Sequence, residues 1–595
     1  MQRPAFGRAW VVDFEFSAPS GHRPEPHCLV VRDIVSGRQL RLWADDLVRL
    51  REAPFPTGRD SLLVSYYAPA EINCFLSLGW PLPANVVDLY AEFRNLTNGL
   101  PVPHGNGLLG ALLHYGLPTM GAIEKDEMRA LAIRGGPFTP EERTALLDYC
   151  AGDVDATCRL YSVMAPRLPA HALLRGRYTM AVARMEHEGV PVDGRTIRLI
   201  GENRERIRSR LIAGIDPLGE IYDGGSFIEA NFSAWLARRG IAWPRLDSGR
   251  LALSEDVFDD QADADPRVRP VKELRAALAQ LRRDELAIGP DGRNRCMLSP
   301  FSSISGRNQP STSRFIFGAP SWMRRLIRPE PGMALAYIDW AQQEFGIAAA
   351  LSGDAAMMQA YSSGDPYLGF AMLAGAVPQD ATKRSHPEVR DIFKMVVLGV
   401  GYCMSAQGLA QRLSIPLSRA EELLELHRRC FPVFWRWSEA AADYGQLSGH
   451  IHARFGWGLH VTGRTKIRTL RNFPAQANGA EMMRLAACYA TEAGIAVCAP
   501  VHDAFLIEAP ADEIGAAVAR MAEAMRRASA DVLGGFELGS DAKAIVYPDH
   551  FEPGRGGQIW DVVNAAIAEI DPSHGRQGTP ATGDTPAQSI KDSLL

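Results

Sequence analysis

The sequence predicts an α/β protein built from several domains. At 595 residues the chain is too long for one ordinary hydrophobic core. Apolar runs with the length and spacing of buried strands occur at residues 8–16, 61–68, 86–89 and 334–338. Stretches with helical spacing of apolar residues, such as 143–161, lie between these runs. Strand and helix patterns thus share the chain, which favours the α/β class.

Bulk properties exclude several classes of protein. The longest apolar runs are too short to span a bilayer, and the N-terminus lacks the apolar core of a signal peptide. Nine cysteines without a CxxC pair predict neither a zinc knuckle nor a disulfide framework, and they suit a reducing cytoplasm. A net charge of −5 argues against a histone-like binder.

One segment departs from this balanced charge. Residues 293–328 contain seven arginines and no acid. A solvated face usually mixes both signs of charge, so we expect a surface that binds a polyanion; an ordinary solvated face is the alternative. The arginines concerned are Arg293, Arg295, Arg307, Arg314, Arg324, Arg325 and Arg328.

Two acids stand at the ends of buried strand patterns. The run 334–338 ends on Asp339, and a helical pattern carrying Glu344 follows. Residues 499–510 form a hairpin pattern with Asp503 at its turn. A lone Asp at a strand end is usually a turn former or a helix cap. Two carboxylates that converge at one sheet edge, however, suit a hard cation such as Mg²⁺ and two-metal phosphoryl transfer.

A helix predicted after Pro387 carries the most specific signal. Arg390, Lys394, Leu398 and Tyr402 recur every four residues and therefore lie along one stripe. An amphipathic helix with snorkelling basic residues is the alternative. A bound triphosphate explains the stripe better: the two cations neutralise phosphates, the leucine packs on sugar and base, and the tyrosine closes the pair.

The N-terminal part carries a second set of acids. Alternation along the strand pattern 8–16 puts Asp13 and Glu15 on the same side. Tyr149 and Asp153 are four apart on the predicted helix 143–161 and share one face. Asp-x-Glu on a buried strand is a metal-binding arrangement found in nucleases, although the triplet is common by chance.

Taken together, these motifs resemble DNA polymerase family A over roughly residues 8–555. The resemblance implies an RNase H-like 3′–5′ exonuclease domain followed by a right-hand polymerase domain with palm, fingers and thumb. Residues 339–344 resemble the first palm motif, and the stripe resembles the fingers helix. Ser305-Gly306-Arg307, the series Arg468, Asn472 and Gln476, and Val501-His502-Asp503 resemble three further motifs in the order of the family.

The resemblance assigns roles at the polymerase site. Asp339 and Asp503 are the metal ligands and, with Lys394, the catalytic residues. The nucleotide-binding residues are Arg390, Lys394, Leu398, Tyr402, Gln342 and Glu344, and Glu344 excludes ribonucleotides at the sugar. The DNA-binding residues are Arg307 in the minor groove, Arg468, Asn472 and Gln476 along the template and primer terminus, and His502 at the primer-terminal phosphate.

At the exonuclease site, the resemblance makes Asp13, Glu15, Glu71 and Asp153 metal ligands and Tyr149 catalytic. Three positions depart from the family pattern. Glu71 stands where the family has Asp, and its longer arm alters the metal geometry. Leu398 replaces an aromatic residue, which leaves discrimination at the sugar 3′ position open. Ala504 replaces a glutamate, which suggests that this third acid is auxiliary.

The order of motifs divides the chain into six parts. They are the exonuclease domain (1–165), palm entry and thumb (166–300), palm with the first metal-binding motif (301–352), fingers (353–445), palm with the second metal-binding motif (446–560) and a disordered tail (561–595). An exonuclease pattern so near the start leaves no room for a 5′-nuclease domain, which suits a phage or prophage replicase.

We therefore expect a template-directed DNA polymerase with 3′–5′ proofreading. The resemblance implies two Mg²⁺ per active site, with Mn²⁺ as an alternative, and primer-template DNA and deoxynucleoside triphosphates as partners. Replication accessory proteins would be further partners, and the expected location is the cytoplasm of a bacterial host or its nucleoid. A single-subunit RNA polymerase, or a nuclease or DNA-binding protein with a degenerate polymerase half, are the alternatives.

Overall fold

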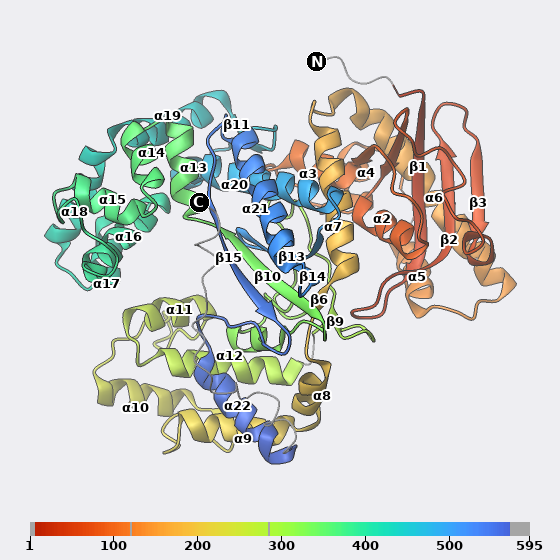
Figure 1. Cartoon of the computed structure of the whole chain (residues 1–595). Coiled ribbons are helices and arrows are strands. Elements are labelled where there is room, and N and C mark those ends of the chain that lie inside the picture. The colour runs from red at the N-terminus through yellow and green to blue at the C-terminus, as the bar shows by residue number, and fades with distance from the viewer. Residues whose placement is uncertain (1–5, 120–121, 284–285, 572–595) are drawn as a thin grey trace.

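The first sheet of the computed structural model has five strands in the order β3-β2-β1-β4-β5 (Figure 1). The structure describes residues 6–119, 122–283 and 286–571. β1 runs antiparallel to β2 and parallel to β4, which is itself parallel to β5. Apolar side chains cover both faces of this sheet, so helices α2 and α6 pack on opposite sides of it. The bounds are β1 (Arg8–Ser17), β2 (Glu25–Asp33), β3 (Gln39–Trp43), β4 (Ser61–Ser65), β5 (Val86–Asp88), α2 (Ala68–Ser77) and α6 (Pro140–Met164).

The second sheet lies at the centre of the molecule and has four strands, β13-β14-β10-β15 (Figure 1). All of its neighbours pair antiparallel, and β10 is an inner strand between β14 and β15. Helices α20 and α21 pack together and against this sheet. The bounds are β10 (Met333–Trp340), β13 (Ala496–Val501), β14 (Ala504–Pro510), β15 (Ser540–Val546), α20 (Ile467–Glu492) and α21 (Ile514–Val532).

A helical lobe follows β10 in the chain and has a separate apolar core (Figure 1). Phe370, Phe393 and Phe431 are fully or nearly fully buried there. The predicted stripe helix is α16 of this lobe, and Pro387 occupies its first turn, where a missing N–H costs nothing. The bounds are α13 (Gln343–Ser352), α14 (Ala355–Ser362), α15 (Pro366–Leu373), α16 (Pro387–Gly401), α17 (Ala406–Leu413), α18 (Leu417–Cys430) and α19 (Pro432–Ser448).

A second helical lobe lies below the central sheet in Figure 1 and contains both early and late parts of the chain. Helix α22 packs against α9 and α12 although more than 250 residues separate them. The expected disordered tail is therefore wrong for residues 561–570, because Ile559, Val563 and Ile567 bury an apolar stripe. The remainder of that prediction, 572–595, falls outside the described residues. The bounds are α8 (Gly194–Glu202), α9 (Arg204–Ile215), α10 (Glu229–Arg239), α11 (Glu255–Ala264), α12 (Arg269–Arg283) and α22 (Gly557–Ile570).

Helix α7 (Ala172–Glu188) joins the two large sheets, since it packs against α2 and β5 on one side and α20 and β13 on the other. Arg175 on this helix forms a buried two-bond ion pair with Glu92 of α3, at 2.6 and 2.9 Å. Gly176 approaches the backbone of β5 so closely that an added Cβ would lie 1.8 Å from the carbonyl oxygen of Val86. The junction between the sheets is thus tightly packed.

Shorter elements complete the structure. No described helix has both the length and the apolar character needed to cross a lipid bilayer. The remaining bounds are α1 (Ala44–Leu47), α3 (Leu89–Thr97), α4 (Leu108–His114), α5 (Ala122–Arg134), η1 (Ala165–Arg167), β6 (Val190–Pro191), β7 (Tyr222–Asp223), β8 (Ser226–Phe227), β9 (Arg293–Asn294), η2 (Ser321–Leu326), β11 (His450–His452) and β12 (Gly458–His460).

Most of the arginines in residues 293–328 face acids of the protein itself. Arg293 pairs with Glu508 at 2.7 Å inside the core, and Arg295 pairs with Asp291 at 2.6 Å. Arg325 and Arg328 pair with Glu552 and Asp193. The expectation of one polyanion-binding surface is wrong for these four residues, because acids of the protein neutralise them: the nearby Asp291 for Arg295, and acids distant in sequence for the other three. Arg307, in contrast, lines the pocket described next.

Candidate active site

Asp339 and Asp503 lie at the same end of the central sheet. Asp339 is opposite Ala504 in the β10–β14 register, and Asp503 immediately precedes Ala504. The backbone N–H of Trp340 donates to the carbonyl oxygen of Asp503 at 3.4 Å. His502 takes a left-handed conformation, with φ of +56°, in the tight turn that presents Asp503. The hairpin geometry thus brings together two acids that are 164 positions apart.

The surroundings of both carboxylates oppose their charge. Burial raises the pKa of Asp339 to about 7, and the charges of Asp503 and Asp541 add to the effect. Burial also raises the pKa of Asp503, while its own backbone N–H and the charges of Arg307 and His502 act in the opposite direction. Buried acids with raised pKa values often mark functional sites.

The donor atoms suit a hard cation. Asp339 Oδ1 is buried and has no hydrogen-bond partner in the described structure. A buried carboxylate oxygen without a partner is costly unless something positive meets it. Magnesium prefers carboxylate oxygens as protein ligands. Asp339 and Asp503 therefore fit the metal ions that the sequence leads us to expect.

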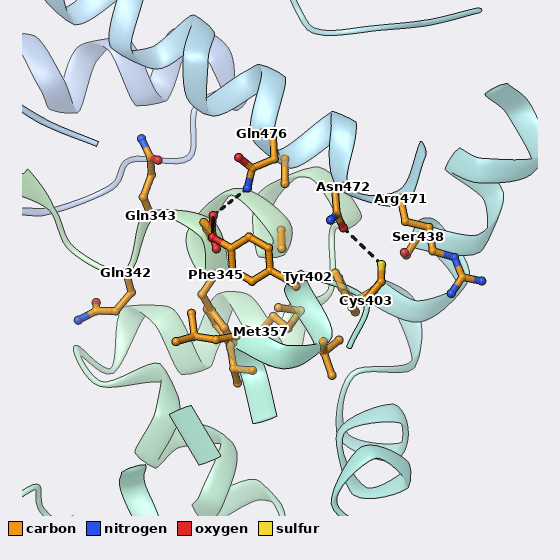
Figure 2. Close-up of a pocket in the computed structure, with 18 of the residues that line it drawn as sticks. Gln342, Gln343, Phe345, Met357, Tyr402, Cys403, Ser438, Arg471, Asn472 and Gln476 are labelled. Atoms are coloured by element: carbon orange, nitrogen blue, oxygen red, sulfur yellow. Dashed lines mark hydrogen bonds between the residues drawn. The ribbon is translucent and has the colours of Figure 1, made fainter. Parts of the chain in front are cut away.

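A pocket of about 360 Å³ opens beside Asp503, between the central sheet, α13, α16, α19 and α20, although Asp339 is not among its lining residues (Figure 2). It gathers nine residues that the sequence assigned to the polymerase site, from segments spread over almost 200 positions. They are Arg307, Gln342, Glu344, Leu398, Tyr402, Asn472, Gln476, His502 and Asp503.

Glu344 links three helices at this pocket. Its Oε1 accepts hydrogen bonds from the hydroxyl of Tyr402 and the amide of Gln476, both at 2.8 Å. Figure 2 shows the ring of Tyr402 in the middle of the pocket, with Gln476 and Asn472 above it on α20. Burial, then the charge of Glu344, raises the pKa of Tyr402 to about 12. The phenol therefore stays protonated and acts as a donor.

The two cations of the stripe lie at the border of the pocket. The guanidinium of Arg390 pairs with Asp365 and lies 5.3 Å from the ring centre of Tyr367. Lys394 Nζ lies 5.9 Å from the same ring, and Tyr367 itself lines the pocket. Arg468, like Arg390 and Lys394, is absent from the pocket lining, although it precedes Asn472 by one turn on α20.

The lining residues that the sequence motifs missed include Arg471 and Cys403. Arg471 lines the pocket but falls one position away from the series of every fourth residue that singled out Arg468 and Asn472. Cys403 donates from its thiol to Asn472 Oδ1 at 3.3 Å. Cys403 follows Tyr402 directly, so it does not belong to the series of every fourth residue that defines the stripe.

The N-terminal acids gather at the first sheet. Asp13, Glu15 and Cys150 offer ligand atoms within 4.8 Å of one another, and within the described ranges this is the only such group of three. Tyr149 and Asp153 lie on α6 next to Cys150, and burial followed by the charges of Asp153, Glu15 and Asp13 raises the pKa of Tyr149. Cys150 was missed because a single cysteine carries no motif.

Glu71 lies beside this group but is engaged by the backbone. Its Oε2 accepts a hydrogen bond at 2.8 Å from the N–H of Phe14, the residue between Asp13 and Glu15. Burial, and then the charge of Asp13, raises the pKa of Glu71. One of its oxygens thus holds the strand that carries the two acids.

Comparisons with known proteins agree with this geometry. Residues 318–539 match the family described as DNA polymerase family A. This segment therefore carries the sequence pattern of DNA polymerase family A. This confirms the family expected from the motifs. The matched range contains Asp339, the stripe helix and Asp503.

Curated members of family A align over longer or shorter parts of the chain. A thermostable DNA polymerase I from Thermus aquaticus is 27% identical over 469 residues, 72% of this chain and 53% of the relative. A DNA polymerase from Mycobacterium phage D29 is 29% identical over 227 residues, 38% of this chain and 36% of the relative. The chain thus spans about half, or less, of the length of these relatives.

A solved structure of the family shares the fold. The POL domain of Pol1 from M. smegmatis, in complex with DNA primer-template and dNTP, superposes with a TM-score of 0.68 at 18% identity. The match covers 91% of this chain and 95% of that domain. It confirms the expected polymerase fold.

Proposed function

We propose that this protein is a template-directed DNA polymerase that adds deoxynucleotides to a primer 3′-OH. The observation that carries the proposal is the single pocket that gathers nine predicted site residues next to the Asp339 and Asp503 carboxylates. The partners of this reaction are primer-template DNA and deoxynucleoside triphosphates. The complex in which the Pol1 domain was solved supports this choice of partners.

The side chains divide the work of the reaction. Asp339 and Asp503 would hold two Mg²⁺ ions, or Mn²⁺; when bound, these would lower the pKa of the primer hydroxyl and neutralise the triphosphate. Arg390 and Lys394 bind the phosphates, and Leu398 and Tyr402 pack on the incoming nucleotide. The remaining predicted residues act on the substrates: Glu344 and Gln342 at the sugar side, Arg307, Arg468, Asn472 and Gln476 along the duplex, and His502 at the primer-terminal phosphate.

In this proposal Glu344 discriminates between sugars. Its carboxylate is held by the Tyr402 hydroxyl and the Gln476 amide, so it cannot easily turn away from the pocket. A ribose 2′-OH would meet this fixed group. Extension with deoxynucleotides should therefore exceed extension with ribonucleotides, and the reverse preference would favour the single-subunit RNA polymerase.

A second activity, 3′–5′ exonuclease, is supported by the cluster on the first sheet. Asp13, Glu15 and Cys150 have possible ligand atoms within 4.8 Å of one another. Tyr149 and Asp153 lie on α6, the helix that carries Cys150. In this proposal Asp13, Glu15, Glu71 and Asp153 hold metal ions, and Tyr149 orients the attacking water. Glu71 also positions the strand through Phe14.

The domain division is part of the same proposal. An RNase H-like exonuclease domain (1–165) is followed by a thumb and palm entry (166–300), palm (301–352), fingers (353–445) and palm (446–560). Helix α22 joins the thumb through its packing on α9 and α12. A cytoplasmic location follows from the proposed substrates.

Replacing either palm acid tests the polymerase assignment. Asp339→Asn or Asp503→Asn should lower primer extension by a factor of at least ~100, because loss of metal stabilisation is worth several kcal/mol. DNA affinity, measured by fluorescence anisotropy, should change little. Asp512→Asn, an exposed acid in the loop after β14, is the control. Extension near the parent rate in either palm variant would remove the assignment.

A further inference from the structure

A third acid faces Asp339 from the other neighbouring strand. In the antiparallel β10–β15 register, Asp339 is directly opposite Asp541. In the β10–β14 register, the same residue is opposite Ala504. Residues directly opposite one another in an antiparallel pair project on the same face of the sheet. Asp541 therefore projects from the same face of the sheet as Asp339. It lies on β15, whereas Ala504 lies on β14, the other neighbour of β10.

The local structure fixes this register. Beyond the paired aspartates, the N–H of Ala341 donates to the carbonyl oxygen of Gly539 at 2.9 Å. The hydroxyl of Tyr361 then bridges the same two residues: it donates to Ala341 O at 3.0 Å and accepts from Gly539 N at 3.2 Å. A slip of one residue would break these bonds and turn Asp541 to the opposite face.

Asp541 can supply the carboxylate that is missing at position 504. A carboxylate at 504 would approach Asp339 from β14, but alanine there offers none. Asp541 supplies a carboxylate from β15 instead, and it is exposed at the edge of the sheet.

We propose that Asp541 is a third carboxylate of the metal site in the palm. The inference rests on the proposed polymerase function, because it assumes that Asp339 and Asp503 hold ions. Among the described residues, Asp339, Asp503 and Asp541 do not form a group with all ligand atoms within 4.8 Å.

Metal binding in the assembled complex tests the proposal apart from catalysis. Mn²⁺ affinity is measured by electron paramagnetic resonance on protein with a dideoxy-terminated primer-template and a dNTP. Every variant carries Asp13→Asn, so that the N-terminal cluster adds no strong site. Asp541→Asn should weaken Mn²⁺ binding by about tenfold. Asp541→Glu should keep the affinity within about threefold of the parent, because the carboxylate is retained.

Two comparison variants separate the outcomes. Asp549→Asn removes an exposed acid just after β15 and should leave Mn²⁺ affinity at the parent value. Asp339→Asn should weaken it more than Asp541→Asn. If Asp339→Asn weakens binding and Asp541→Asn does not, the role of Asp541 is overturned while the polymerase proposal stands. If Asp339→Asn also leaves binding unchanged, the proposed function is overturned, and this inference with it.

Discussion

At the scale of single residues, Asp339 shows how the site opposes the stability of the fold. The carboxylate lies at the rim of a buried sheet, with one oxygen unpartnered and with Asp503 and Asp541 nearby. Each of these features disfavours the charged form. A bound metal ion would offset these unfavourable interactions. The charged Asp339 carboxylate therefore destabilises the metal-free protein more than the metal-bound protein. Such trade-offs are common at functional sites.

This electrostatic penalty predicts a pH-dependent effect of Asp339→Asn on the stability of the metal-free protein. The pKa of Asp339 is about 7 in the folded state, above its ordinary value near 3.8. Between these values the folded state binds more protons than the unfolded state, so the free energy of unfolding falls as pH rises. Asparagine lacks this penalty.

In EDTA at pH 8, Asp339→Asn should therefore melt above the parent by on the order of 1–3 °C, and near pH 4 the difference should vanish. Differential scanning calorimetry at both pH values measures the effect. An equal difference at pH 4 and pH 8 would mean that packing, and not charge, is responsible.

At the scale of elements, local patterns were enough to predict the strands and helices that carry the motifs. The run at 8–16 is β1, the run at 334–338 lies in β10, and the helix at 143–161 lies in α6. The predicted hairpin at 499–510 is β13 and β14, with Asp503 in its turn. These elements could be predicted because their periodicity and turn signals lie within about a dozen residues.

Strand neighbours that are distant in sequence could not be predicted in this way. Nothing near Asp541 announces that β15 pairs with β10, and nothing near Arg293 announces Glu508. The burial of α22 depends on apolar surface of α9, which lies more than 340 residues earlier. Where a functional residue depends on such pairing, a motif in one segment cannot predict it.

The junction helix α7 offers a test at this scale. Gly176→Ala should destabilise the protein, because the new Cβ would lie 1.8 Å from the Val86 carbonyl oxygen and β5 would have to move. The expected cost is about 1–3 kcal/mol, as for other overpacked sites. Gly201→Ala on α8 is the matched control: it meets only the end of the Arg204 side chain, at 3.8 Å, and removes a helical glycine.

Gly201→Ala should be neutral or more stable by about 0.5–1 kcal/mol. Urea unfolding monitored by circular dichroism compares both variants with the parent. If Gly176→Ala matched Gly201→Ala in stability, the close packing of α7 on β5 would not hold in solution.

At the scale of the whole molecule, each of the two large sheets carries one of the proposed groups of catalytic acids. Asp13 and Glu15 lie on the first sheet, Asp339 and Asp503 lie on the central sheet, and α7 packs between the sheets (Figure 1). The two groups of acids lie on different strands of different sheets, and α7 is the helix that packs against both sheets. The proposed activities should therefore be separable by substitution.

The double substitution Asp13→Asn with Glu15→Gln tests this separation. It should abolish removal of the 3′-terminal nucleotide from a 5′-labelled primer incubated without dNTPs, because the cluster on β1 loses its charge. Extension of a matched primer should stay within about twofold of the parent rate, since the pocket beside Asp503 is untouched. Asp148→Asn, an exposed acid of α6 paired with Arg41, controls for a general effect on that domain. A parallel fall in extension would show that the two sites depend on one another through α7.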